Sequence, residues 1–286
     1  MRSTLDAVAA DLTVAAALRA ATTRLAASDS PRLDAELLLA HSLGVSRTYL
    51  YSHPEIEVDA ACNARFEALL DARARHTPLA YLTGSAEFWS LTFTVTPAVL
   101  VPRAETEVLV AEVLAAWPAD KPGVMLDIGT GSGAIAAAIA HERPALSVFA
   151  SDCSDAALRV ARNNFVQLGL ERVACLRGHW LRAMAAQSLD LIVSNPPYVG
   201  AAEAVDAAVT FEPATAVYAA DEGLAALAAI VNEAPRCLKP GGYIALEHGY
   251  QQGALVRALL AAQGFKRVAS TRDLAGHERV SAAWRD

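Results

Sequence analysis

The chain has 286 residues, of which 54% are hydrophobic and 19% are charged, and its formal net charge is −7. This length is sufficient for about two domains with buried cores, and the hydrophobic content excludes an intrinsically disordered protein. The acidic charge argues against a large nucleic-acid interface, which normally presents a basic surface.

The sequence lacks the patterns typical of secreted, metal-binding or membrane proteins. Its four cysteines are scattered without a C-x-x-C pair, as in a reduced cytosolic protein: Cys62, Cys153, Cys175 and Cys237. The seven histidines have no metal-ligand spacing. Asp6 and Asp11 interrupt the first apolar segment, so we predict an amphipathic helix there rather than a signal peptide. No stretch reaches the ~18 apolar residues of a membrane span, and a cytoplasmic location is expected.

Residues 1–77 are predicted to form a small helical domain. A first helix is indicated by apolar residues at helical spacing: Leu5, Val8, Leu12 and Ala16. Ser30 and Pro31 are typical of the N-cap and first turn of a second helix, which Gly44 would end. Asp59 is a candidate cap for a third helix.

Residues 78–104 are predicted to form a β-hairpin linker. Apolar and polar residues alternate strictly from Leu91 to Thr96, which is typical of a half-buried strand. Apolar segments at 87–89 and 98–101 flank this strand and complete the expected hairpin.

From residue 105 onward, short apolar strands alternate with helical segments. The strands are predicted at Val124–Ile128, Ser147–Ser151, Val173–Leu176, Leu189–Ser194 and Tyr243–Glu247, with late strands at 266–270 and 279–284. The helices are predicted near 106–116, 132–141, 155–169, 222–238 and 251–263. This alternation predicts an α/β domain whose mostly parallel sheet is covered by helices on both faces. Because no helix separates the late strands, we expect an antiparallel strand at the end of the chain.

A glycine-rich turn, Asp127–Gly133, joins the first strand of this domain to its helix. Its G-x-G-x-G spacing matches neither the dinucleotide fingerprint nor a P-loop, so a pyrophosphate-binding role is disfavoured. Glycines allow a tight turn and a close approach of backbone to a ligand. A purely structural turn is the alternative.

Asp152 ends the next strand, about twenty residues further on, where a carboxylate can accept both hydroxyls of a ribose. Alternatively, Asp152 caps the helix that begins near Asp155. The turn and the carboxylate together describe a pocket for a nucleoside that lacks phosphates and carries an amino-acid tail. S-adenosylmethionine fits this description better than NAD or ATP.

The tetrapeptide Asn195-Pro196-Pro197-Tyr198 follows a buried strand. Its prolines end the strand and hold Asn195 in extended backbone at the carboxyl edge of the sheet, where open α/β folds bind ligands. The side-chain oxygen of Asn195 and the carbonyl of Pro196 can accept both hydrogens of a planar amino group, and Tyr198 can pack against it. This arrangement would orient a nitrogen toward a methyl donor. An ordinary tight loop is the alternative.

The tetrapeptide and the glycine turn resemble those of class I methyltransferases that alkylate planar nitrogens. The wider chain is similar to one family, the peptide chain release factor glutamine methyltransferases of the HemK/PrmC type. The similarity covers roughly residues 30–286 and includes, in order, the segments 78–84, 87–89, 99–107, 211–213, 246–249, 272–273 and 278–279.

This resemblance implies a Rossmann-like catalytic domain at 105–286, with a seven-stranded, mostly parallel sheet, and a substrate-recognition domain at 1–77. It implies S-adenosylmethionine as the cofactor, the Gly-Gly-Gln glutamine of class 1 release factors as the substrate, and a monomer. The implied cofactor-binding residues are Asp127, Gly129, Thr130, Gly131, Ser132, Gly133, Asp152, Trp180 and Asn195. The implied substrate-binding residues are Asn195, Pro196, Pro197 and Tyr198, and all except Pro197 are also expected to be catalytic.

The chain departs from the family pattern at two positions. His179 stands before Trp180, where the family usually has an acid that would accept from the adenine amino group. Neutral imidazole could replace that acceptor with one nitrogen, or His179 could have no role. Ala104 replaces a proline after Arg103.

Two other functions are compatible with the sequence. The first is a nucleic-acid amino-methyltransferase acting on adenine N6 or guanine N2, which would need a flipped base and a basic surface. The second is a cofactor-binding regulatory module without catalysis, which the intact Asn195 and Tyr198 argue against.

Overall fold

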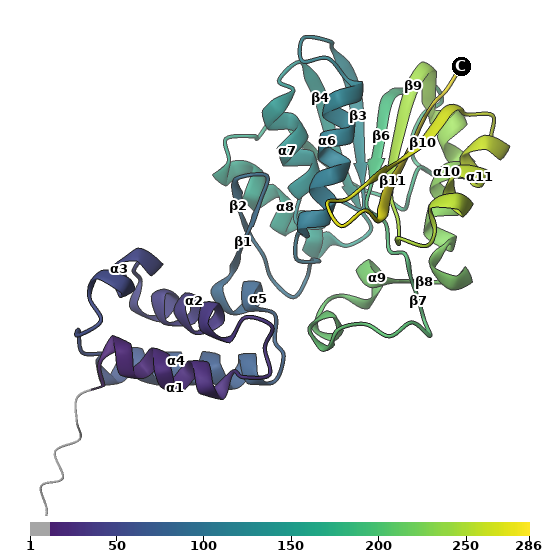
Figure 1. Ribbon diagram of the computed structural model, residues 1–286. Coiled ribbons are helices and arrows are strands. Elements are labelled where there is room, and N and C mark those ends of the chain that lie inside the picture. Colours follow the sequence, from purple (N-terminus) through teal and green to yellow (C-terminus); the bar gives the residue numbers. More distant parts are fainter. Residues whose placement is uncertain (1–11) are drawn as a thin grey trace, which may run out of the picture. The chain divides into compact units, whose positions relative to one another are not determined.

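Figure 1 shows the computed structural model, which describes residues 12–286. These residues form two compact units, divided between Gly84 and Ser85. Of the first predicted helix, Leu5 and Val8 lie outside the described residues. No helix between residues 12 and 286 is long and apolar enough to cross a bilayer.

The first unit is helical, as predicted. Its helices are α1 (Val14–Arg24), α2 (Pro31–Leu43), α3 (Arg47–Ser52), α4 (Ala60–Ala74) and α5 (Leu79–Thr83). Gly44 ends α2 in the left-handed conformation at φ 67°, and the Asp59 side chain caps α4 by accepting from the backbone N–H of Cys62. Ser30 precedes α2 but its side chain makes no capping bond; its hydroxyl donates instead to the buried carboxylate of Asp34 at 3.1 Å.

The second unit begins with the predicted hairpin, strands β1 (Ser85–Phe88) and β2 (Leu91–Thr94), which pair antiparallel. Trp89 and Ser90 form its turn at φ 52° and 57°, the positive values that a tight two-residue hairpin turn requires. The segment 98–101, expected to complete the hairpin, forms no strand.

Seven of the described strands form one sheet in the order β10-β11-β9-β6-β3-β4-β5. Their bounds are β3 (Gly123–Ile128), β4 (Leu146–Asp152), β5 (Ala174–Arg177), β6 (Leu189–Ser194), β9 (Leu238–Glu247), β10 (Lys266–Arg272) and β11 (Glu278–Trp284). Strands β3, β4, β5, β6 and β9 run parallel, whereas β11 is antiparallel to both of its neighbours, β9 and β10. The predicted α/β fold, with a mostly parallel sheet and a terminal antiparallel strand, is therefore confirmed.

Helices cover both faces of this sheet (Figure 1). They are α6 (Glu107–Ala116), α7 (Ala134–Glu142) and α8 (Asp155–Gln167) on one face and α10 (Ala225–Cys237) and α11 (Gly253–Ala262) on the other. Successive strand residues point to opposite faces. In β6, Leu191 and Val193 therefore pack with the first group of helices and Ile192 with the second, all fully buried.

Short elements connect the strand ends. They are the strands β7 (Val199–Gly200) and β8 (Tyr218–Ala219), the helix α9 (Ala214–Val217) and the 3-10 turns η1 (Ala104–Thr106), η2 (Ala207–Phe211) and η3 (Asp221–Gly223). The register of the sheet determines which strand ends lie next to each other. Ile128 pairs with Ser151 on one side and with Ser194 on the other, so the residues that follow these three strands emerge together at one edge.

Candidate active site

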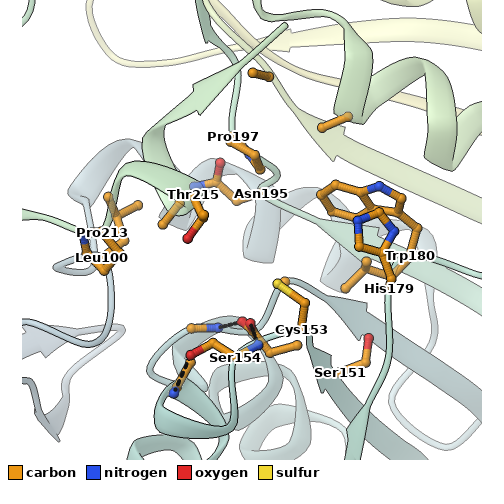
Figure 2. Close-up of a pocket in the computed structure, with 18 of the residues that line it drawn as sticks. Leu100, Ser151, Cys153, Ser154, His179, Trp180, Asn195, Pro197, Pro213 and Thr215 are labelled. Carbon is orange, nitrogen blue, oxygen red and sulfur yellow. Dashed lines mark hydrogen bonds between the residues drawn. The ribbon is translucent and has the colours of Figure 1, made fainter.

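A cavity of about 400 Å³ lies at the carboxyl edge of β3, β4 and β6. Figure 2 shows Asn195 across this cavity from Cys153, with Trp180 toward one end and Pro213 toward the other. The predicted site residues that line it are Gly129, Gly131, Asp152, Trp180, Asn195 and Pro197. The sheet thus brings together residues from four strand ends, of which Ile128 and Ser194 are 66 positions apart in the chain.

The glycine turn presents backbone to the cavity. Gly129 and Gly131 have φ values of 71° and 54°, and a Cβ on either would meet no atom within 4 Å. Gly133 has a different role, because a Cβ there would lie 2.7 Å from the ring of Phe165 in α8. Gly129 and Gly131 therefore leave the cavity free of side chains at the turn, whereas Gly133 lets α8 pack closely against the turn.

Asp152 joins the glycine turn to the start of α8. Its Oδ2 accepts from the backbone N–H of Gly131 at 3.0 Å, and its Oδ1 accepts from the N–H of Ser154 at 2.8 Å. The N-cap of α8 is Ser154 itself, whose hydroxyl accepts from the N–H of Ala157. Asp152 therefore does not act as the helix cap, and its carboxylate lies at the cavity wall.

Asp127, Thr130 and Ser132 lie behind the turn and do not line the cavity in the described structure. Asp127 is fully buried, and its Oδ2 accepts from the hydroxyl of Thr130 at 2.6 Å. Burial raises the pKa of Asp127 to about 7, with a smaller contribution from the charge of Asp152. Local sequence spacing could not separate these supporting residues from the glycines that line the cavity.

Hydrogen bonds to Thr106 and Glu247 fix two side chains of the tetrapeptide 195–198. The side-chain Nδ2 of Asn195 donates to Oγ1 of Thr106 at 3.1 Å, and the hydroxyl of Tyr198 donates to Oε1 of Glu247 at 3.2 Å. Pro197 lines the cavity, whereas Pro196 and Tyr198 do not. Burial raises the pKa of the Tyr198 phenol, so this hydroxyl keeps its proton.

Several cavity residues were not predicted from the sequence. They come from the segment after the hairpin, from α9 and β8, and from the start of α10: Ala98, Val99, Leu100, Thr215, Ala216, Tyr218, Ala219, Ala220, Ala225 and Ala226. An ion pair of 2.6 Å between Arg103 and the buried Glu212 holds the 98–100 and 213–220 segments near each other. Arg103 and the segment 211–213 were both noted in the sequence. Their pairing was not predicted, because the two residues are 109 positions apart and no local pattern relates them.

His179 and Trp180 border the cavity side by side, with ring centroids 5.1 Å apart and in an edge-on arrangement. Trp180 has a φ of 52°, an uncommon left-handed conformation for a large side chain. Both residues follow Gly178, directly after the end of β5, and all three line the cavity.

Two family models match the chain. Residues 16–84 match the PrmC N-terminal domain and residues 104–262 match the methyltransferase small domain. A release factor glutamine methyltransferase from Xylella fastidiosa is 44% identical over 268 residues, which cover 93% of this chain and 96% of that protein. A release factor glutamine methyltransferase from Escherichia coli is 42% identical over 267 residues, which cover 92% of this chain and 96% of that protein. The chain belongs to the release factor glutamine methyltransferase family.

The family predicted from the sequence is thus confirmed, and the chain is a methyltransferase. Solved methyltransferases share the fold. A methyltransferase from Pyrococcus furiosus has a TM-score of 0.53 at 20% identity, covering 78% of this chain and 96% of that one. A ribosomal protein L11 methylase from Lactobacillus delbrueckii has a TM-score of 0.52 at 22% identity, covering 67% and 84%.

Proposed function

We propose that this methyltransferase uses S-adenosylmethionine to methylate the side-chain amide nitrogen, N5, of the glutamine in the Gly-Gly-Gln motif of peptide chain release factors. The observation that carries the proposal is that the glycine turn, Asp152 and Asn195 all line one cavity. The names of the relatives from Xylella fastidiosa and Escherichia coli support the choice of substrate.

The cavity residues fit S-adenosylmethionine. Gly129 and Gly131 leave room for a ligand against the backbone. Asp152 already accepts two backbone N–H bonds, but a carboxylate has about four lone-pair sites, so acceptor capacity is left for ribose hydroxyls. His179 and Trp180 offer flat surfaces for a purine. The volume of about 400 Å³ lies within the range of small-molecule sites.

When bound, S-adenosylmethionine supplies a methyl group on a positively charged sulfur, which is already a strong electrophile. Asn195 and Pro196 therefore have to orient the glutamine amide rather than deprotonate it. Their two oxygens would accept its two hydrogens and direct the face of the nitrogen toward the donor. Orientation of this kind can contribute up to about 7–11 kcal/mol. The carbonyl dipoles also stabilise the charge that develops on nitrogen, and the proton then leaves to solvent.

The remaining assignments follow from this proposal. The helical domain, residues 1–77, would recognise the release factor, the hairpin segment 78–104 would link it to the catalytic domain, and residues 105–286 would carry the chemistry. We propose that the protein acts as a cytoplasmic monomer. Its substrate is then a protein that it meets in solution, not a nucleic acid, and the net charge of −7 agrees with that choice.

The test is methyl transfer from radiolabelled S-adenosylmethionine to three acceptors: unmodified bacterial release factor, a Gly-Gly-Asn variant of that factor, and bulk RNA. We expect label on the native release factor alone. Label on RNA instead would mean that Asn195 binds a base, and the proposed substrate would be wrong. Cofactor binding without transfer to any acceptor would favour a regulatory module.

A further inference from the structure

Gln252 lies immediately before α11, and its side chain holds the backbone that leaves the tetrapeptide. Its Nε2 donates to the carbonyl oxygen of Tyr198 at 3.0 Å and to the carbonyl oxygen of Glu222 at 3.2 Å. Its Oε1 accepts from the backbone N–H of Gly249 at 2.9 Å. All three partners are backbone groups, and Gln252 does not line the cavity in the described structure.

These partners determine which way the side-chain amide of Gln252 faces. A backbone N–H can only donate a hydrogen bond, and a carbonyl can only accept one. The side-chain oxygen must therefore face Gly249, and the NH2 group must face the two carbonyls. The turn that carries the side chain is itself closed, because the backbone N–H of Gln252 donates to the carbonyl of Gly249 at 2.8 Å. Gln252 is thus held in place as a double donor.

The carbonyl of Glu222 belongs to a strained turn next to the cavity. Asp221 and Glu222 both have a φ of 53°, and Gly223 follows at 89°. Residues other than glycine keep such a conformation only where the surrounding structure holds them in it. A Cβ on Gly223 would overlap the carbonyl of Tyr198, so the turn packs directly against the tetrapeptide. Ala220, which precedes the turn, lines the cavity.

The two prolines connect the position of Tyr198 to the atoms that would bind the substrate. Pro196 and Pro197 have fixed φ torsions, so the backbone between them has little freedom to absorb a shift. The start of the tetrapeptide is held by the sheet, where the hydroxyl of Ser194 donates to the carbonyl of Ile128 at 2.7 Å. The direction of the Pro196 carbonyl therefore depends on how the other end is held as well.

We infer that Gln252 is a positioning residue for methyl transfer. Its two donated bonds hold the end of the tetrapeptide and the 221–223 turn together, in the arrangement that directs the Pro196 carbonyl at the substrate amide. The inference rests on the function proposed above, in which that carbonyl accepts a hydrogen from the glutamine of the release factor.

The experiment compares Gln252→Glu and Gln252→Met with the unmodified enzyme. An ionised glutamate keeps the acceptor for Gly249 but loses both donors, whereas methionine keeps the length of the side chain and loses both functions. We expect kcat for release factor methylation to fall about 10–100-fold in both variants, the effect of a small misplacement of a reacting group. The Kd for S-adenosylmethionine should stay close to that of the unmodified enzyme, because the bonds described for Gln252 end on residues other than the glycine turn and Asp152.

The pH dependence of Gln252→Glu gives a readout that general destabilisation would not produce. The two carbonyl oxygens favour the protonated form of the new acid, and this form regains one donor for Tyr198. The kcat of Gln252→Glu should therefore recover relative to that of Gln252→Met as the pH falls from 8 to 6. Titration of other groups cancels in this ratio. A ratio that stays constant over the range would overturn the inference.

Gln251 provides a matched control. It is exposed, and its Nε2 donates to the hydroxyl of Tyr250 at 2.9 Å. Gln251→Glu therefore makes the same change of charge one position away and keeps the three bonds of Gln252, so kcat should be unchanged. An equal loss of kcat in Gln251→Glu and Gln252→Glu would overturn the inference, because the added charge would then be responsible.

A wild-type kcat in Gln252→Met would overturn the inference as well. The proposed function fails separately, and in a measurement that needs no variant, when the unmodified enzyme labels no release factor. The variants test the inference only in an enzyme that does label it.

Discussion

At the residue scale, the site contains side chains that border the cavity and side chains that hold them in place. Asn195 and Asp152 belong to the first kind, and each would have a distinct chemical task. Asn195 would bind the nitrogen that is methylated, whereas Asp152 would bind the cofactor. Substitutions at the two positions should therefore affect different kinetic constants.

Replacing Asn195 with alanine should abolish turnover and spare cofactor binding. The Asn195→Ala variant loses one of the two oxygens that orient the substrate amide, so we expect kcat to fall by about 100-fold or more. Isothermal titration should give an S-adenosylmethionine affinity close to that of the unmodified enzyme. Asn232→Ala, at an exposed asparagine in α10, is the control. Retained turnover in Asn195→Ala would remove this residue from the mechanism.

Replacing Asp152 with alanine should weaken cofactor binding. Hydrogen bonds to a charged group are worth about 1.5–3 kcal/mol, so the Kd for S-adenosylmethionine should rise roughly 10–100-fold. Asp155→Ala removes a neighbouring carboxylate that pairs with Arg177 at the surface, and it should leave the Kd unchanged. If both variants bound the cofactor normally, Asp152 would be only a brace for the glycine turn.

At the element scale, the glycine turn depends on close packing against α8. Gly133 has a φ of 85° and a Cβ there would lie 2.7 Å from the Phe165 ring. Gly276 has nearly the same φ, 84°, but nothing within 4 Å of its Cβ position. The two positions share the backbone cost of a side chain at positive φ and differ only in the space available.

Alanine substitutions at Gly133 and Gly276 allow the packing cost to be measured separately from the backbone cost. Gly276→Ala should lower the free energy of unfolding by about 1–2 kcal/mol, the backbone cost of left-handed geometry. Gly133→Ala should lower it by a further 1–3 kcal/mol or so, the usual cost of overpacking. Urea unfolding of both variants gives the two values. Equal losses would mean that the Phe165 ring moves aside without cost.

Patterns in the sequence predicted the elements well because those patterns are local. The period of the apolar residues located the strands of the sheet and most helices within a few positions. Among the boundaries of the seven-stranded sheet, the largest error was the start of β9, which begins at Leu238 rather than Tyr243. The sequence there, Lys239-Pro240-Gly241-Gly242, is typical of a loop, yet it lies within the strand beside a shift in register with β6.

The site was less predictable than the fold, for a physical reason. The glycine turn, Asp152 and Asn195 could be identified because each lies at the end of a strand or directly after it. The contacts that hold them could not, because Thr106 and Asn195 are 89 positions apart and Arg103 and Glu212 are 109 apart. Whether Asp127 lines the cavity or supports it depends on its side-chain direction, which spacing in the sequence does not reveal.

At the scale of the whole molecule, burial of carboxyl groups links folding to pH. Asp127 and Glu247 each have a folded pKa of about 7, above the ordinary values of 3.8 and 4.5. Between those limits the folded state holds protons that the unfolded state has released. The unfolded state is therefore favoured as pH rises, and these groups lower the stability progressively from about pH 4 to pH 7.

Asp127→Asn tests this linkage. Asparagine keeps an acceptor for Thr130 but does not titrate, so the variant should gain stability relative to the unmodified protein as pH rises from 5 to 8. Thermal unfolding at several pH values gives the difference. For Asp273→Asn the difference should stay constant over that range, because the hydrogen bond from Arg279 holds the pKa of Asp273 below its usual value. A constant difference for Asp127→Asn as well would contradict the raised pKa.

The cavity has a wall made largely of alanines, among them Ala98, Ala216, Ala219, Ala225 and Ala226. Alanine has no side-chain rotamers, so a ligand that settles against this wall freezes no side-chain torsions there. The entropy lost on binding then falls mainly on the ligand and on the few longer side chains opposite. In a chain so rich in alanine, the smallest side chains give the cavity a shape that is fixed before any ligand arrives.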